Sequence, residues 1–136
     1  MIKLICSAII ILTFVGCDFP AGEPITVFCK EFDSTEVIKV SLKESKRVKS
    51  LDGKFVQVKG YYRDNFEDVA LYPSRNADSQ KALWLDMKIP DSIPLAKLDS
   101  LRERKILLIG KINISDKGHL GAYLATLENI TCLKAL

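Results

Sequence analysis

The sequence predicts a mainly β fold: a small, strongly bent antiparallel β-barrel with one or two short helices. Residues 55–62 (FVQVKGYY) place Val56, Val58 and Gly60 on one side and Gln57 and Lys59 on the other, which is the two-residue period of a strand. A glycine inside a strand, as at Gly60, usually marks a sharp bend or a bulge. Behind an apolar leader, about 120 residues are enough for one domain with a modest core.

The remaining elements follow from the same signals in chain order. β-branched residues in alternation predict the first strands, and a charged stretch without Gly or Pro predicts a short helix. Two prolines predict a connection or short helix before the most apolar strand, and Asp-Lys-Gly at 116–118 predicts a hairpin turn. The expected strands are 26–32, 36–42, 55–62, 69–72, 82–87, 105–114 and 122–130, with Cys132 just beyond the last; the expected helical segments are 43–51 and 89–98.

Two segments fifty residues apart share one pattern. Residues 50–60 and 100–110 both carry Ser-Leu, a basic residue and an alternating strand that ends at a glycine, Gly60 or Gly110. The pattern predicts two similar bent strands, and the alternative is a coincidence between two ordinary strands. The first segment resembles the G-K-x-V-x-V-x-G strand of OB-fold barrels, and this resemblance implies five short, strongly bent strands.

A second resemblance covers residues 50–131. The block 65–87, with its Phe-acidic turn, LYPS and ALWLD, together with GHLG at 118–121, resembles a group of small bacterial envelope proteins. What the resemblance implies is a fold, with no activity attached to it.

The N-terminus predicts a secretory signal. Lys3 is the only charge in residues 1–16, and an uncharged apolar stretch runs from position 4 to position 15. Twelve helical residues span roughly 18 Å, short of the roughly 30 Å hydrocarbon core, so a spanning helix is disfavoured. A basic start followed by a compact apolar centre is typical of a signal that is removed.

The leader ends in FVGC, residues 14–17, which resembles the bacterial lipobox, although Phe14 stands where Leu is usual. The resemblance implies a diacylglyceryl group on Cys17 and cleavage directly before it. Residues 1–16 are then a lipoprotein signal peptide, 17–24 the acylated cysteine and a tether, and 25–136 a single OB-like barrel domain. The alternatives are a plain signal peptide cut nearby, or a buried cysteine in an apolar helix.

This interpretation predicts the bacterial cell envelope as the location and the lipid bilayer as a partner through Cys17. Each buried acyl methylene contributes about 0.8 kcal/mol, and two or more chains hold a protein stably on a bilayer. Asp18 resembles the enteric-type signal for inner-membrane retention, which favours the inner membrane, facing the periplasm, over the outer membrane. The Pro- and Gly-containing residues 18–24 form the expected tether.

The lipoprotein assignment also determines the expected state of each cysteine. Of Cys6, Cys17, Cys29 and Cys132, the first leaves with the signal and the second is acylated. In an oxidising compartment the remaining pair favours a disulfide between Cys29 and Cys132. Closing a loop of about 100 residues would contribute on the order of 4–5 kcal/mol in the chain-entropy model. The alternative is two free thiols in the barrel wall.

Several classes of function have no support in the sequence. The chain holds 20 Lys and Arg against 17 Asp and Glu with no long basic run, so nucleic acid is not predicted as a partner. His119 is the only histidine and no CxxC occurs, so neither a metal nor a cofactor is predicted. No catalytic residue is predicted either: His119 has no pairing with a nucleophile, and Glu67 and Asp68 are interpreted as turn residues.

Aromatic and basic residues gather in one third of the chain. OB-fold barrels bind their ligands on a strand face that carries such side chains, so these residues form a candidate ligand face. The ordinary alternative is that the aromatic residues fill the small barrel and cover its ends. The face consists of Tyr62, Arg63, Tyr72, Arg75 and Trp84.

These observations favour a membrane-anchored envelope lipoprotein that acts as a non-catalytic binding or interaction module. An envelope protein or a saccharide is the expected partner class. This hypothesis expects an exposed aromatic or apolar patch and no cluster of perturbed titrating groups. The alternatives are an envelope hydrolase that uses His119 with a nearby carboxylate, and a structural or immunity-type lipoprotein without a small ligand.

Overall fold

The structure, a computed structural model, describes residues 24–31 and 36–136, so the predicted signal peptide and Cys17 lie outside the described residues. Two short helices and two 3-10 turns accompany the strands. The helical elements are α1 (Ser45–Ser50), α2 (Leu95–Asp99), η2 (Ser79–Lys81) and η3 (His119–Gly121). The strands are β1 (Ile25–Cys29), β2 (Ile38–Lys39), β3 (Phe55–Asn65), β4 (Asp68–Tyr72), β5 (Leu83–Leu85), β6 (Lys105–Asn113) and β7 (Ala125–Ala135).

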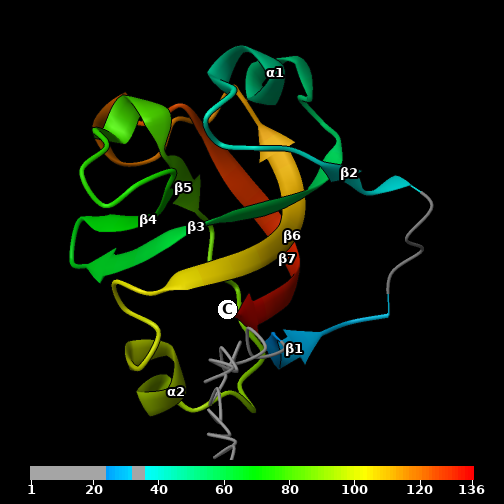
Figure 1. Ribbon diagram of the computed structural model, residues 1–136, viewed down its shortest axis with the longest axis vertical. Helices are drawn as coiled ribbons and strands as arrows, with labels where there is room; N and C mark the ends of the chain where they lie inside the picture. Colours follow the sequence, from blue (N-terminus) through cyan, green and yellow to red (C-terminus); the bar gives the residue numbers. More distant parts are fainter. Residues whose placement is uncertain (1–23, 32–35) are drawn as a thin grey trace, which may run out of the picture.

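Five of the strands close into a barrel. β3 pairs with β4, β4 with β5, β5 with β7, β7 with β6, and β6 returns to β3. Only the β5–β7 pair in this ring is parallel. The ring in Figure 1 is the small, mainly β, OB-like barrel with short helices that the sequence predicts, and this prediction is confirmed.

The core fills the interior of the barrel because alternate residues of each strand point inward. In β3, Val56, Val58 and Tyr62 are buried, while Gln57 and Lys59 between them face outward. The helices cover the two ends of the barrel in Figure 1, where α1 buries Val48 and α2 buries Leu98. Other fully buried members of this core include Leu71, Leu83, Ile106, Leu108, Ile112, Leu127 and Leu133.

Gly60 occupies an inward-facing position of β3 where the chain cannot accept a side chain. A Cβ atom there would lie 2.6 Å from the carbonyl oxygen of Tyr72 and 2.8 Å from Cγ of Leu71. Beside it, β3 changes partner on one edge: Gln57 pairs with Lys39 of β2, whereas Tyr61 pairs with Tyr72 of β4. On its other edge, β3 stays paired with β6 from Phe55 to Tyr61.

Gly110 has the corresponding place in β6, as the fifty-residue repeat predicts. A Cβ atom there would meet Leu127 Cγ at 2.8 Å and the carbonyl oxygen of Glu128 at 3.0 Å. The β6–β7 register shifts at this point, and Asn129 in β7 adopts a positive φ of 49°. Asn is one of the few non-glycine residues that accept this conformation readily. The β6–β7 pairing therefore forms a bulge here, and the bulge bends the sheet.

Several element bounds differ from the sequence prediction, and three of them affect the pairing of the strands. The strand expected over 36–42 is reduced to Ile38–Lys39, β3 extends to Asn65, and β7 runs to Ala135 so that Cys132 lies within it. The long strands extend because β3 and β7 each pair with three neighbours, and these ladders continue beyond the locally apolar residues. Residue 32, the last of the expected first strand, lies outside the described part of the chain, as do residues 33–35.

β1 joins the barrel along the edge of β7. Cys29 lies directly opposite Cys132 in the register, with the two Cα atoms 4.0 Å apart and the two sulfur atoms at disulfide-bonding distance. The cysteines are 103 residues apart in sequence, so the contact connects the start and the end of the folded region. The predicted pairing is confirmed as a contact at this distance.

Candidate functional site

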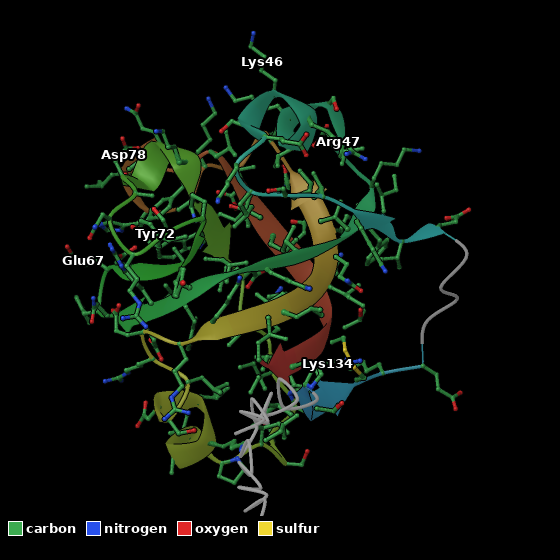
Figure 2. All side chains as sticks on the ribbon, viewed as in Figure 1. Lys46, Arg47, Glu67, Tyr72, Asp78 and Lys134 are labelled. Atoms are coloured by element: carbon green, nitrogen blue, oxygen red, sulfur yellow. A yellow bond between two sulfur atoms is a disulfide. The ribbon has the colours of Figure 1, made fainter. Side chains whose placement is uncertain are left out.

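Four of the five residues of the predicted ligand face gather around β4 on the outside of the barrel, and the fifth, Tyr62, does not. Tyr72 and Trp84 lie in a second apolar cluster with Tyr61, Ala70 and Tyr123, separate from the barrel core. These residues come together because Ala70 pairs with Trp84, and Tyr72 lies two residues further along the same face of β4. Figure 2 shows Tyr72 on this side of the barrel with Glu67.

Tyr62 is the exception and does not belong to the face. Its side chain is 2% exposed and lies in the barrel core. Adjacent residues of a strand point to opposite sides, so Tyr62 and Arg63 cannot share one face. Tyr61 takes the outward position instead. Burial, together with the nearby Asp64 carboxylate, raises the pKa of Tyr62 above its ordinary value.

Asp68 is the polar centre of the cluster. Its Oδ1 accepts a hydrogen bond from Tyr72 Oη at 2.8 Å and another from Tyr123 Oη at 2.7 Å. Its Oδ2 lies 3.5 Å from Nη1 of Arg63, and both side chains are partly buried. Asp68 begins β4 and Tyr123 precedes β7, so this single carboxylate connects two regions 55 residues apart.

The two arginines of the predicted face are also engaged. The Arg63 guanidinium lies over the Tyr72 ring, 3.9 Å from its centroid, and its Nη2 donates to the carbonyl oxygen of Arg75 at 2.7 Å. The Arg75 guanidinium lies 5.2 Å from the centroid of Tyr61. Cation–π contacts and this hydrogen bond fix the loop after β4 onto the strands. The arginines therefore act mainly in holding the cluster together.

Trp84 connects this cluster to the loop between β6 and β7. Its ring is stacked with His119 at a centroid distance of 6.4 Å and tilted against Tyr123 at 5.2 Å. Gly118, with a φ of 67°, lies so close to Trp84 that any Cβ atom would overlap the indole ring. The loop contacts the indole closely and leaves Trp84 partly exposed.

Perturbed titration in the cluster has a structural origin. Burial first, and the Asp68 carboxylate second, raise the pKa values of both Tyr72 and Tyr123 above 10.0. A carboxylate next to a phenol disfavours the phenolate because the two negative charges repel. Both phenols are therefore proton donors to Asp68 at neutral pH, which suits a fixed scaffold rather than general acid or base chemistry.

His119 does meet a carboxylate, as the hydrolase alternative requires. Its Nε2 lies 3.9 Å from Oε2 of Glu67. However, the two side chains are 40% and 65% exposed, and neither residue lines the cavities of about 470, 260 and 330 Å³ on the described part of the chain. A catalytic pair needs a cleft that positions a substrate and excludes water, so this contact serves better as a link between two loops.

Two exposed apolar side chains beside this link were not among the residues of the predicted ligand face. Phe66, in the turn between β3 and β4, is 99% exposed, and Leu120, within η3, is 88% exposed. They neighbour Glu67 and His119 in sequence, the two residues that connect the loops. Composition alone could not distinguish them from core residues, although Phe66 follows an Asp-Asn pair typical of a turn. No group of His, Cys, Asp or Glu that could hold a metal occurs within 24–31 and 36–136.

The Asp68 network yields a prediction. Asp68→Asn should lower the free energy of unfolding at neutral pH by about 1–3 kcal/mol, because one buried hydrogen bond and the attraction to Arg63 are weakened. Glu67→Gln, at the exposed neighbouring carboxylate, should change it by no more than about 0.5 kcal/mol. Urea unfolding measures both values.

The same variant tests the assigned pKa shifts. The pKa values of Tyr72 and Tyr123 in the folded state lie above the ordinary 10.0. The stability that their hydrogen bonds to Asp68 contribute is therefore complete below pH 10.0 and is lost as the pH rises towards the folded-state pKa values. Tyrosinate ultraviolet absorbance of Asp68→Asn should rise at lower pH than that of the unchanged chain. An identical titration in both proteins would contradict the network.

Neither a protein-family model, nor a curated protein, nor a solved structure matches this chain. Its function therefore has to follow from its own residues and their geometry.

Proposed function

We propose that the chain is an envelope lipoprotein, anchored to the bilayer through Cys17, whose barrel is a non-catalytic module that binds an envelope protein. The observation that carries the binding role is the pair of exposed apolar side chains Phe66 and Leu120. We name the surface formed by the turn 65–68 and by η3 the loop patch.

The conformation of Leu120 supports a role in binding. Its φ is 54°, in the left-handed region that costs an ordinary residue about 1–2 kcal/mol. A glycine would avoid this cost, and Leu120 buries almost no apolar surface in return. A strained residue that does not pack in the core is often retained for function, because such strain gathers at binding and active sites.

The loop patch is also held in place before any partner arrives. Tyr123 donates to Asp68, its Oη lies 3.4 Å from the carbonyl oxygen of Glu67, and His119 lies against both Glu67 and Trp84. Binding by a rigid surface loses less conformational entropy than binding by a mobile one. Single exposed apolar residues are common on proteins. Two of them on turns that a contact holds together give a partner an apolar centre of the kind found in many protein interfaces.

The anchor supports the same function by confining the module. Seven residues, 18–24, separate Cys17 from the first strand. Fully extended, they reach no more than about 25 Å, so the barrel would stay close to the membrane surface. Confinement raises the effective concentration of a membrane partner. No described helix is long and apolar enough to cross a bilayer.

The cysteine pair is consistent with an oxidising compartment. A Cys29–Cys132 bond would stabilise the fold where thiols are oxidised and would be rare in a reducing cytosol. The proposed location is the inner membrane, with the barrel facing the periplasm.

The anchor has a direct test. Mass spectrometry of the protein from native membranes should find a lipid-modified cysteine, residue 17, as the first residue. In a Cys17→Ser form, the barrel should appear in the soluble envelope fraction. An unmodified thiol at Cys17, or a Cys17→Ser form that still sediments with membranes, would reject the anchor.

The loop patch is tested by photo-crosslinking in native membranes. A photoreactive amino acid at position 66 should give a discrete adduct with an envelope protein. The same group at position 95, where Leu95 is 78% exposed on α2, is the matched control and should give none.

Leu120→Gly adds a second readout to this experiment. Because glycine relieves the strain at φ 54°, the variant should be at least as stable as the unchanged chain, yet its adduct from position 66 should be weaker. Equal adducts from positions 66 and 95, or an adduct unaffected by Leu120→Gly, would argue against the loop patch.

A further inference from the structure

A groove lies on the outer face of β3, away from the residues that form the loop patch. It has a volume of about 470 Å³ and is lined by the chain after β2, by β3, and by the ends of β4 and β6. It opens where the pairing along one edge of β3 is interrupted, between Gln57, opposite Lys39, and Tyr61, opposite Tyr72. Volumes of this size are typical of small-ligand sites.

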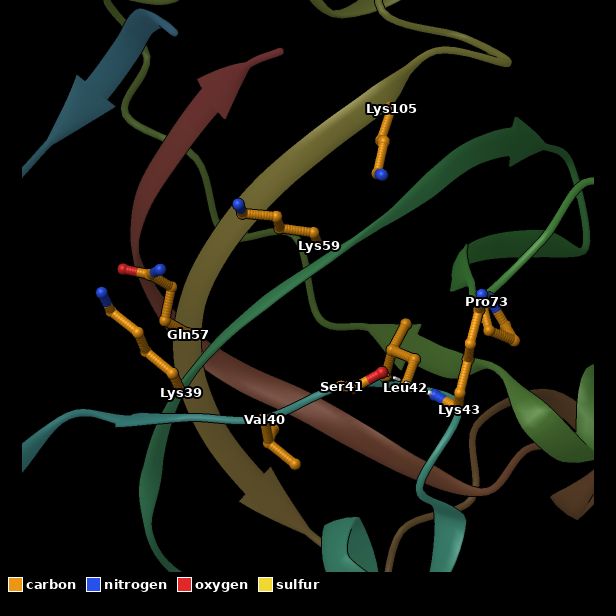
Figure 3. Close-up of a pocket in the computed structure, with 9 residues that line it drawn as sticks. All are labelled: Lys39, Val40, Ser41, Leu42, Lys43, Gln57, Lys59, Pro73 and Lys105. Carbon is orange, nitrogen blue, oxygen red and sulfur yellow. Dashed lines mark hydrogen bonds between the residues drawn. The ribbon is translucent and has the colours of Figure 1, made fainter.

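Four lysines surround the groove: Lys39, Lys43, Lys59 and Lys105. Figure 3 shows Lys39 beside Gln57, Lys59 along β3, Lys43 next to Pro73, and Lys105 at the opposite side. Their positions follow from the register. Lys39 pairs with Gln57 and Lys105 with Tyr61, so both share the outward face of β3 with Lys59.

No opposite charge compensates these side chains within the described structure. None of the residues lining the groove is acidic, and none of the four lysines takes part in an ion pair among the described residues. Like charges at neighbouring positions of a sheet destabilise it. A bound anion would remove that repulsion, and Ser41 and Gln57 supply further hydrogen-bond donors at the same site.

We propose that this lysine groove binds a ligand that carries more than one phosphate group. Lysine acts on phosphate as a point charge with three donors on a flexible stem, and several lysines around one groove suit clustered negative charge better than a single carboxylate. The proposal is independent of the loop patch and of the anchor, because the two surfaces share no residue. A soluble diphosphate and a lipid headgroup that carries two phosphate groups both present this chemistry.

The test is a calorimetric titration of the full chain, purified in a nonionic detergent, with inorganic pyrophosphate. Saturable binding at low salt should be at least about tenfold tighter than that of orthophosphate, because the second phosphate group makes additional charge-assisted contacts with the lysines. Raising the salt concentration should weaken it by screening.

Matched variants separate the groove from overall charge. Lys59→Gln combined with Lys105→Gln should lower the pyrophosphate affinity at least about tenfold, from the loss of two such contacts. Lys46→Gln combined with Lys97→Gln removes the same charge from α1 and α2, outside the groove, and should lower it by less than about twofold. The four lysines replaced in these two variants are exposed, and thermal melts would verify that each variant is folded.

A second titration identifies the source of the phosphates. Short-chain diphosphatidylglycerol is compared with short-chain phosphatidylcholine in the same detergent. Tighter binding of pyrophosphate than of the lipid would support a soluble ligand, and tighter binding of the lipid would support a membrane headgroup. In either case, the variant with Lys59→Gln and Lys105→Gln should weaken the binding.

Failure of both probes to bind, or an equal loss of affinity in the two double variants, would overturn the proposal. Self-association of the groove variant with unchanged phosphate binding would also overturn it, because the lysines would then serve to keep the strand edge from pairing with another chain.

Discussion

The close approach of β4 to Gly60 is the constraint on which the rest of the structure depends. β3 is the strand that closes the barrel, since it pairs with β6 on one edge and with β4 on the other. The carbonyl of Tyr72 and the side chain of Leu71 occupy the space that a Cβ atom at position 60 would need. Without a side chain at that point, β3 can pass from β2 to β4 and still keep its register with β6.

Both proposed surfaces are consequences of that passage. Where β2 leaves β3 and β4 has not yet joined it, the sheet edge is open, and the outward residues of β3 line the lysine groove. Beyond Gly60, the β3–β4 pair continues outward to the turn that carries Phe66 and ends at Asp68. Asp68 then binds Tyr123, so the loop that carries Leu120 is held beside that turn. Pairing thus determines where each surface lies, and side-chain chemistry determines what it can bind.

The prediction from sequence succeeded where a pattern within one short segment reflects how the whole barrel is built. Alternation around Gly60 and Gly110 is visible in single segments, and it correctly indicated two bent strands and a small barrel. The pairing of Cys29 with Cys132 followed from elimination and was correct because both flank the same edge of the barrel. The presence of Tyr72, Arg63, Arg75 and Trp84 around one outer region was also predictable, since they cluster along the chain.

One failure of the prediction was local, because alternation alone places Tyr61, and not Tyr62, on the face of Arg63. The other features that were missed depend on long-range contacts. The partnership of Asp68 with Tyr123 spans 55 residues and leaves no local pattern. The lysine groove was missed for the same reason: its four lysines come from three separate segments, and each is unremarkable alone.

The most direct test of this account is the stability of Gly60→Ala. The methyl group would meet backbone as well as the Leu71 side chain, so the free energy of unfolding in urea should fall by about 1–3 kcal/mol or more. Lys59→Ala, at the preceding residue of β3, whose side chain faces outward, should change this free energy by no more than about 0.5 kcal/mol. A Gly60→Ala chain as stable as the unchanged protein would contradict the claim that this contact closes the barrel.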